Sequence, residues 1–223
     1  MRAVYYQAFN IAKIALENNL LNYQGDKPPA IIFDLDETLL DNSYFEADLI
    51  LAGNSYTPEN WKEWSDKQCA KDLPGAIDFV EFAINTEVEI FYVSNRTVKE
   101  VKSTFNNMKK LGFPEIPIEN YIFKETTSSK IERRNYISEN YEIILLLGDN
   151  LNDFDGIFED RNSNSGFNEV DNNKEFFGKK YIIFPNPMYG NWEKPLIKDN
   201  KISKYNNRIN ALISSADICK ELK

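Results

Sequence analysis

Two aspartates one residue apart, Asp34 and Asp36, follow directly on the apolar run 30–33, and Thr38 completes an Asp-x-Asp-x-Thr pattern. A short apolar run of this kind is typical of a strand buried on both faces. One carboxylate at the end of such a strand is a candidate nucleophile, and a second one in a different environment is a candidate general acid and base. Loops are rich in acidic residues, so Asp-x-Asp by itself is a weak signal.

Further polar residues follow this pattern in an order that strengthens it. They are a hydroxyl and an amide after a second apolar run, a lysine in a basic helix, and two aspartates after the most apolar run of the chain: Ser94, Asn95, Lys130, Asp149 and Asp153. Carboxylates, a hydroxyl and a lysine together fit phosphoryl transfer, in which charge on a phosphate must be bound and neutralised. Oxygen ligands in this number predict a site for a hard divalent cation.

Helical and strand patterns alternate along the chain and would position these residues. We expect helices over 3–21, 74–85, 97–111 and 128–139, a helix opened by Thr57 and Pro58, a helical tail from about 203, and strands over 30–33, 88–93, up to 124, 143–147 and 181–184. We expect 161–175 to form a polar loop. Alternation predicts an α/β fold with a parallel sheet and helices on both faces. Ligands bind outside the carboxyl ends of such strands, where the polar clusters would converge.

Composition excludes several classes of protein. The chain has 223 residues, a net charge of −9 and no histidine. A histidine nucleophile, a Ser-His-Asp triad and a histidine-ligated zinc or haem site are therefore excluded. The two cysteines, Cys69 and Cys219, predict neither a disulfide framework nor a cysteine zinc site. The negative charge argues against a nucleic-acid partner, although a local metal still permits an anionic small substrate.

The motifs together resemble the haloacid-dehalogenase-like (HAD) superfamily of phosphohydrolases, and more closely its class C (subfamily IIIB) acid phosphatases. The resemblance rests on DLDETLLDNS, Trp61-x2-Trp64, FYVSNR, MKKLGF, GDNLNDF and Tyr189-Gly190-x-Trp192, and it covers almost the whole chain. Members of the family are bacterial surface lipoproteins that hydrolyse nucleoside 5′-monophosphates and nicotinamide mononucleotide. The resemblance implies an HAD-like Rossmannoid sheet with a small, mostly helical cap.

The resemblance also implies a division of the chain. Residues 30–41 and 74–223 would form the HAD-like core, with the C-terminal part also joining the cap. Residues 42–73 would be the cap insertion, and the helix within 1–29 would contribute to the cap.

By resemblance, Asp34 is the nucleophile that forms an aspartyl-phosphate, and Asp36 is the general acid and base. Mg²⁺ would be held by the carboxylates of Asp34 and Asp149 and by the backbone carbonyl of Asp36. A simple cap of a turn or helix is the alternative role for Asp36. The oxygen-rich donor set follows from the residue types, whereas the identity of the ion as Mg²⁺ is an expectation.

The remaining polar residues would bind phosphate or support the site. Ser94 would bind a phosphoryl oxygen together with backbone N–H groups of Asn95 or its neighbour, or else Ser94 is a plain helix cap. Lys130 would balance the charge of Asp34 and of the phosphate. The alternative is that Lys130 belongs to a solvent-exposed basic face of a helix and has no role in the site. Asp153 would hold a metal-bound water or the lysine from behind.

Two aromatic residues are candidates for substrate binding. The resemblance implies that Trp61 and Tyr189 stack on the two faces of the base of a nucleotide. Stacking tolerates different bases and suits a broad nucleotidase. The alternative is that Trp61 and Trp64, three residues apart on one helix face, only pack against the core.

Three other functions stay open on the residues alone. One is an HAD phosphatase for sugar phosphates. The second is a non-catalytic, receiver-like phospho-acceptor domain, which also combines an acidic cluster, a hydroxyl and a lysine. The third is a surface adhesin with an inactive site, which the intact set Asp34, Asp36 and Asp149 disfavours.

Location and assembly rest on the resemblance alone, which implies the bacterial outer membrane or periplasm and a homodimer. The first residues show no signal-peptide pattern, and neither cysteine lies near the start. We therefore expect contact with a membrane only through a lipid anchor outside these residues. The uncapped first helix leads us to expect that natural sequence precedes it.

Overall fold

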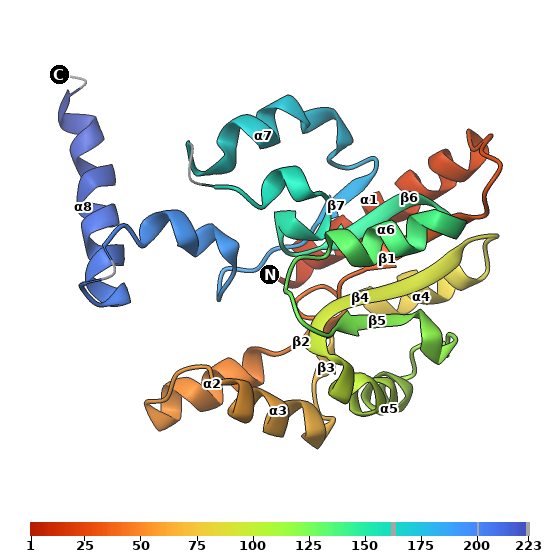
Figure 1. Cartoon of the computed structure of the whole chain (residues 1–223), viewed down its shortest axis with the longest axis horizontal. Coiled ribbons are helices and arrows are strands. Elements are labelled where there is room, and N and C mark those ends of the chain that lie inside the picture. Colours follow the sequence, from red (N-terminus) through yellow and green to blue (C-terminus); the bar gives the residue numbers. More distant parts are fainter. Residues whose placement is uncertain (162–163, 200, 222–223) are drawn as a thin grey trace.

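The computed structural model describes residues 1–161, 164–199 and 201–221. Five parallel strands form its centre in the order β5-β4-β1-β6-β7 (Figure 1). Their bounds are β1 (Pro29–Phe33), β4 (Glu89–Thr97), β5 (Tyr121–Lys124), β6 (Glu142–Gly148) and β7 (Tyr181–Ile183). Because β1 lies between β4 and β6, the residues that follow these three strands meet at one edge of the sheet. The predicted α/β fold is confirmed.

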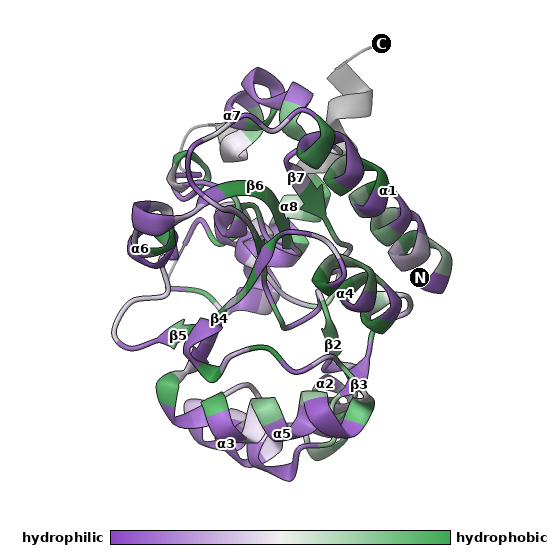
Figure 2. Cartoon of the chain, turned by 90° about the vertical axis from the view of Figure 1, so that its right-hand side faces the viewer, coloured by the Kyte–Doolittle hydropathy of each residue, from purple (hydrophilic) through white to green (hydrophobic). Residues whose placement is uncertain are grey.

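Alternate residues of β1 enter different hydrophobic clusters, one on each face of the sheet. The helices nearest the sheet are α1 (Arg2–Leu21), α4 (Ala76–Ile84), α5 (Val101–Leu111) and α6 (Ile131–Asn140). Ile31 and Phe33 pack in a cluster with residues of α1, α4 and α5, whereas Ala30 and Ile32 pack in a second cluster with Ile137 of α6. Figure 2 shows the hydrophobic strand β6 between α1 and α6. Burial on both faces explains why the strands are apolar runs.

The insertion after β1 folds into a small helical cap. It contains α2 (Ser43–Ala52) and α3 (Pro58–Lys67), and at its base a two-stranded antiparallel ribbon pairs β2 (Leu40–Asp41) with β3 (Lys71–Asp72). Thr57 caps α3 through a capping box and Pro58 opens it, as predicted. The cap lies beside α5 (Figure 1), with contacts between α3 and α5.

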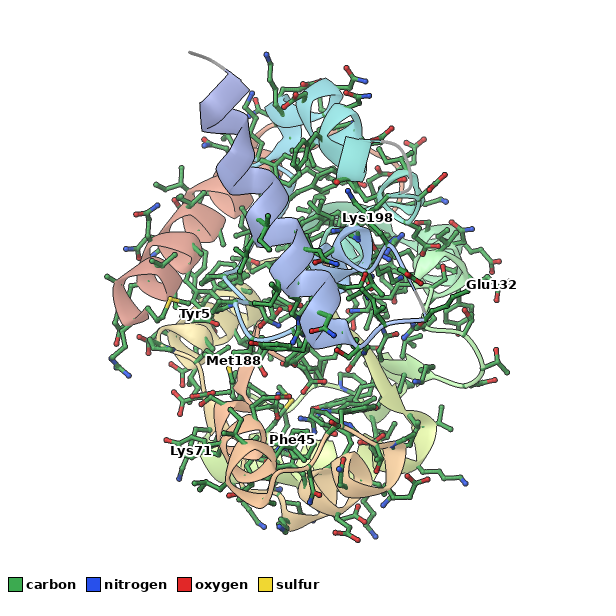
Figure 3. The ribbon with its side chains drawn as sticks, turned by 90° about the vertical axis from the view of Figure 1, so that its left-hand side faces the viewer. Tyr5, Phe45, Lys71, Glu132, Met188 and Lys198 are labelled. Atoms are coloured by element: carbon green, nitrogen blue, oxygen red, sulfur yellow. The ribbon has the colours of Figure 1, made fainter. Side chains whose placement is uncertain are left out.

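The first helix packs on the sheet, and its first turn lies across a cavity from the start and end of the insertion. Contacts of α1 are with β6, β7 and α4, which belong to the core. Its first turn and the base of the cap line a cavity of about 780 Å³, with Tyr5, Tyr44, Lys71 and Met188 among the lining residues. Figure 3 shows Tyr5, Lys71 and Met188 from this side. The division of the chain into core and cap stays a prediction.

The C-terminal third departs from the predicted pattern at one place. The prediction of an unbroken polar loop over 161–175 is wrong, because α7 (Phe167–Asn172) lies within it. None of the residues of α7 is buried, so no apolar period marks this helix in the sequence. The helical tail is confirmed as α8 (Lys204–Glu221), which lies away from the sheet (Figure 1). Among the described residues, no helix is both long and apolar enough to cross a membrane.

The strand β4 is longer than the predicted strand 88–93 and continues through Ser94 and Arg96 to Thr97. Its pairing with β5 shifts register between Ser94 and Thr97. A shift of this kind turns side chains toward new directions at the end of a strand. It brings the buried side chains of Ser94 and Arg96 to the edge where β1 ends.

Candidate active site

The loop after β1 places its carboxylates by folding around a single carbonyl. The backbone oxygen of Leu35 accepts the amides of Leu39 and Leu40 at 2.9 and 2.8 Å. The amide of Asp34 donates to the carbonyl of Leu147 in β6 at 2.8 Å, which fixes the buried Asp34 between the two strands. Glu37 takes a left-handed conformation with φ of 62°. These hydrogen bonds and the conformation of Glu37 form a tight loop, which positions Asp34, Asp36 and Glu37.

Lys130 joins two carboxylates inside the site. Its ammonium lies 2.5 Å from Oδ1 of Asp34 and 2.6 Å from Oδ1 of Asp153. The lysine side chain is only 3% exposed, so its charge is compensated by these carboxylates rather than by water. Burial lowers the pKa of Lys130, but Asp153 and Asp34 outweigh burial and hold that pKa above its usual value. A solvated helix face is therefore the wrong explanation for this lysine.

Three carboxylates converge beside the lysine and suit a cation. Oxygens of Asp34, Asp149 and Asp153 all lie within 4.8 Å of one another. Burial, with the charges of Asp153 and Asp36, raises the pKa of Asp34 to about 7 against the pull of Lys130. Burial, with Asp153 and Asp34, also raises the pKa of Asp149 well above its usual value. The raised pKa values mean that the ionised carboxylates are unfavourable in these surroundings. A divalent cation would stabilise the ionised form, because carboxylate oxygens are hard ligands for it.

Asp153 is held by protein groups at both of its oxygens. Oδ1 contacts Lys130 and Oδ2 accepts the amide of Asn150 at 2.9 Å. A Cβ on Gly148 would lie 2.4 Å from Oδ2 of Asp153, so the glycine makes room for this side chain. The Gly-Asp-x-x-x-Asp spacing thus brings Asp149 and Asp153 into one cluster, and the supporting role of Asp153 stays a prediction. Asn186 orients Asp149 by donating to its Oδ2 at 2.7 Å.

The carboxylate of Asp36 is held by two side chains for which sequence analysis predicted no role. The guanidinium of Arg96 donates to both of its oxygens, from Nε at 3.0 and 3.2 Å and from Nη2 at 2.8 Å. Asn42, the last residue before α2, donates its Nδ2 to Oδ1 of Asp36 at 2.9 Å. Asp36 therefore joins the core to the cap and is no simple helix cap.

Ser94 and Asn95 lie at the end of β4, where phosphate would bind by prediction. The hydroxyl of Ser94 lies 3.5 Å from Oδ2 of Asp36, and its oxygen accepts the amide of Arg96 at 3.1 Å. Arg133 of α6 donates to the carbonyl of Ser94 at 2.6 Å and to Oδ1 of Asn95 at 2.7 Å. Arg133 thus ties the end of β4 to the helix that follows Lys130. The buried Ser94 is brought to the site, whereas Asn95 is exposed.

The two aromatic candidates have different neighbours. The ring of Trp61 lies 5.2 Å from Phe45 and 6.2 Å from Tyr56, centroid to centroid, and Arg96 lies 5.5 Å from its centroid. Trp61 is half-buried, whereas its helix neighbour Trp64 is buried and donates to Asn42. Packing therefore explains Trp64, and Trp61 keeps an accessible part.

Tyr189 reaches the site from the segment after β7. Its hydroxyl donates to Oε1 of Glu37 at 3.0 Å. Burial and the charges of Glu37, Asp36 and Asp149 raise the pKa of Tyr189 well above its usual value, so the phenol stays protonated as a donor. Glu37 was missed as a site residue, although it stands inside the motif itself.

These features define the class of the protein. An Asp-x-Asp-x-Thr loop after the central strand, a hydroxyl after the neighbouring strand, a buried lysine and a further aspartate after β6 form the site of an HAD phosphohydrolase. A family model described as HAD superfamily, subfamily IIIB (Acid phosphatase), matches residues 1–192. The chain belongs to this family and is a class C acid phosphatase, a phosphoric monoester hydrolase. The receiver and adhesin alternatives are therefore wrong.

Two solved structures are similar to this chain over most of its length. Both are of the class C acid phosphatase from Bacillus anthracis, and each is 38% identical to this chain. One has tungstate bound, with a TM-score of 0.87 over 94% of this chain and 90% of the other. The second has a TM-score of 0.84 over 93% of this chain and 87% of the other.

The contacts of Glu37 generate a prediction about stability. Burial raises the pKa of Glu37 to about 8 from 4.5, with Asp36 adding to the shift and hydrogen bonds from Asn42 and Tyr189 opposing it. Because the pKa of Glu37 is higher in the folded protein than in the unfolded chain, protonation of Glu37 stabilises the folded protein. This stabilisation is complete below pH 4.5, decreases as the pH rises, and is lost above about pH 8. In EDTA, the free energy of unfolding of the wild type should therefore fall relative to that of Glu37→Gln across this window, by at most about 1.4 kcal/mol per pH unit, and the Tm should fall with it.

Thermal unfolding of both proteins from pH 4 to pH 9, in steps of ~0.5 pH unit, measures this difference. The glutamine keeps an oxygen for the hydroxyl of Tyr189, so the substitution removes the titration and little else. A Tm difference that stays constant over the whole range would show that Glu37 is not protonated in the folded protein.

Proposed function

We propose that this acid phosphatase depends on Mg²⁺ and hydrolyses nucleoside 5′-monophosphates, including nicotinamide mononucleotide, through an aspartyl-phosphate. The observation that carries the proposal is the buried cluster in which Lys130 contacts Asp34 while oxygens of Asp34 and Asp149 lie within 4.8 Å. Tungstate is a tetrahedral oxyanion like phosphate. Its presence in one Bacillus anthracis relative supports a phosphate site of the same kind here.

In the first half of the reaction, a carboxylate oxygen of Asp34 attacks the phosphorus of the ester. The bond from phosphorus to the ester oxygen breaks, and Asp36 gives its proton to that oxygen, so that the alcohol leaves. The ammonium of Lys130 and the hydroxyl of Ser94 would stabilise charge on the phosphoryl oxygens. The contact between Lys130 and Asp34 supports this role, because it places the positive charge at the nucleophile.

In the second half, a water attacks the phosphorus of the aspartyl-phosphate. Asp36 takes a proton from this water, and the bond between phosphorus and the oxygen of Asp34 breaks. Inorganic phosphate leaves and Asp34 is free again. The sum is one ester and one water converted to one alcohol and one phosphate, with the proton of Asp36 restored.

The metal would be held by the carboxylates of Asp34 and Asp149 and by the backbone carbonyl of Asp36. The residues fit such an ion, since they offer hard oxygen donors whose pKa values are raised in its absence. When bound, Mg²⁺ supplies positive charge that offsets repulsion between the nucleophile and the phosphate.

Trp61 and Tyr189 would bind the base of the nucleotide between their rings. The contacts of the two side chains support this role. Trp61 contacts Arg96, the partner of Asp36, and Tyr189 donates to Glu37, the residue after Asp36. Both rings thus lie close to the group that would protonate the leaving oxygen. A sugar phosphate is the second candidate substrate, and it would need neither ring.

Location and assembly are proposed on the family alone. We propose a homodimer in the outer membrane or periplasm of a bacterium, held at the membrane by a lipid anchor.

A substrate panel tests the proposal directly. We expect phosphate release from AMP and nicotinamide mononucleotide to exceed release from glucose 6-phosphate, and EDTA to abolish all of it, because the clustered carboxylates need the cation. Assays of inorganic phosphate at mildly acidic pH, with Mg²⁺ or EDTA, measure this. Release led by the sugar phosphate would refute nucleotide preference, and full activity in EDTA would refute the metal.

Replacing the nucleophile should abolish turnover while the fold survives. Asp34→Asn is nearly isosteric, and Lys130 keeps its contact with Asp153. We expect activity to fall at least about 10⁴-fold, because no attacking oxygen remains. Phosphate release and thermal unfolding, measured on the same sample, check both parts. Substantial activity in the folded variant would assign the nucleophile elsewhere.

Removing either ring should weaken nucleotides selectively. For Trp61→Ala and Tyr189→Ala we expect kcat/KM to fall more for AMP than for ribose 5-phosphate, which has the same leaving oxygen and no base. Loss of base stacking is worth about 1–3 kcal/mol. Tyr189→Phe is the matched control, because it keeps the ring and removes only the hydroxyl. Equal losses on both substrates would show that the rings do not bind the base.

A further inference from the structure

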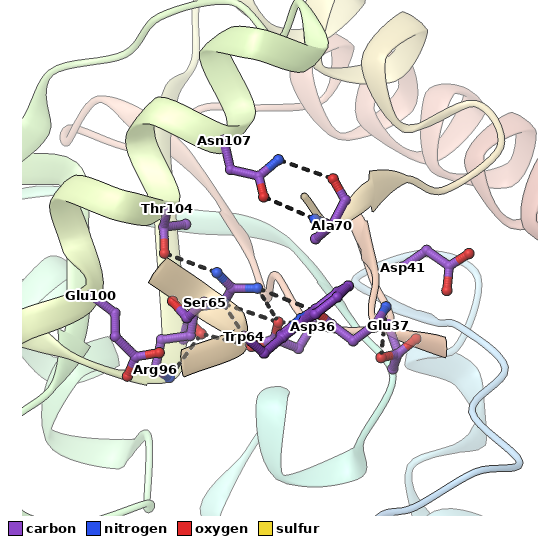
Figure 4. Close-up of polar contacts among 12 residues, drawn as sticks. Asp36, Glu37, Asp41, Trp64, Ser65, Ala70, Arg96, Glu100, Thr104 and Asn107 are labelled. Carbon is purple, nitrogen blue, oxygen red and sulfur yellow. Dashed lines mark hydrogen bonds and ion pairs between the residues drawn. The ribbon is translucent and has the colours of Figure 1, made fainter. Parts of the chain in front are cut away.

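Arg96 stands where the polar network of the site is densest. Its side chain is 1% exposed, although a buried guanidinium is costly unless each donor is satisfied. Nε and Nη2 donate to Asp36, and Nη1 donates to Oγ1 of Thr104 at 3.0 Å. Figure 4 shows Arg96 between Asp36 and Thr104 of α5. Nearly every donor of this side chain is thus used to define its position.

The cap completes the surroundings of Arg96. Oδ1 of Asn42 lies 3.4 Å from Nη2 of Arg96 and also accepts the indole Nε1 of Trp64 at 2.9 Å. The ring of Trp61 lies 5.5 Å from the guanidinium carbon. A cation beside an aromatic ring at this separation is attracted to it. Arg96 is therefore held from α5 on one side and from the cap on the other.

Stability alone does not explain this arrangement. A buried ion pair is weak evidence for stability, because the cost of removing both charges from water offsets their attraction. What distinguishes an arginine–aspartate pair is its geometry. A guanidinium that donates to both oxygens of a carboxylate fixes the plane of that carboxylate, which the ammonium of a lysine cannot do. The carboxylate fixed here belongs to the residue that would move protons in both halves of the reaction.

We propose that Arg96 is a positioning residue for Asp36. It sets the plane of the Asp36 carboxylate and links it to α5 through Thr104 and to the cap through Asn42 and Trp61. This rests on the proposed function, because it takes the proton transfers of Asp36 as given. Arg96 itself does not touch the reacting atoms in this proposal.

Two substrates with different leaving groups distinguish a misplaced Asp36 from a general loss of activity. An aryl phosphate such as 4-nitrophenyl phosphate expels a weakly basic oxygen that needs little protonation, whereas an alkyl phosphate such as glycerol 2-phosphate needs the proton of Asp36. A misplaced Asp36 therefore slows phosphorylation by the alkyl ester. It slows hydrolysis of the aspartyl-phosphate for both substrates, because both proceed through the same intermediate.

The experiment compares Arg96→Lys and Arg96→Gln with the wild type on these two substrates. We expect kcat/KM for glycerol 2-phosphate to fall about tenfold or more beyond any fall for 4-nitrophenyl phosphate, since general acid catalysis contributes about 10²- to 10⁴-fold. With 4-nitrophenyl phosphate, kcat should fall while kcat/KM is nearly kept. A burst of nitrophenol and trapped phosphoenzyme should then appear.

A milder pair of variants covers the case in which Arg96 variants do not fold. Thr104→Val keeps the shape of the side chain and removes the acceptor of Nη1, so it should produce the same substrate split to a smaller extent, about threefold. Ser103→Ala, the neighbouring residue in α5, is the matched control. Its hydroxyl contacts Ser65 and the carbonyl of Glu100 rather than Arg96, so no split is expected.

The outcomes distinguish this inference from the proposed function. A wild type that releases no phosphate from either ester in Mg²⁺ overturns the proposed function and the inference with it. An active wild type whose folded Arg96 and Thr104 variants lose both substrates equally overturns the inference alone. A rise in KM on both substrates with kcat unchanged would mean that Arg96 binds the phosphate directly, which also overturns it.

Discussion

The contact between Lys130 and the carboxylates of Asp34 and Asp153 is the interaction on which the site depends. Gathering three carboxylates at one edge of a sheet is unfavourable, because burial and the neighbouring carboxylates raise the pKa of Asp34 and of Asp149. One buried ammonium compensates part of that charge. A divalent cation at this cluster would neutralise the remaining negative charge, which would otherwise repel an anionic phosphate.

The sheet order explains how residues so distant in sequence share this charge. β1 lies between β4 and β6, and parallel strands deliver their carboxyl ends to one edge. The amide of Asp34 donates to the carbonyl of Leu147, so a backbone hydrogen bond joins the loop of Asp34 to the strand that leads to Asp149. Because the carboxylates follow directly on strands of the sheet, the sheet holds them at fixed separations. Long loops would hold them less precisely.

The sequence predicted the sheet and the charged cluster because both follow from simple patterns. Apolar runs mark strands buried on both faces, and the parallel fold dictates where their polar ends meet. The contacts of Arg96, Asn42 and Arg133 were not predictable in this way. Each depends on a register shift in β4 or on the path of the cap, and neither leaves a periodic signal. The helix α7 was missed for a related reason, since it buries no side chain.

The loop of the Asp-x-Asp-x-Thr motif shows how one segment serves both fold and chemistry. Leu35 is buried and its carbonyl gathers the loop amides, so the segment is fixed before any ligand arrives. Asp34 then faces Lys130, Asp36 faces Arg96 at the cap, and Glu37 faces Tyr189 from the far end of the chain. Three acidic residues of one loop thus contact three separate parts of the molecule. A substitution of Lys130, Arg96 or Tyr189 therefore acts directly on a carboxylate of this loop.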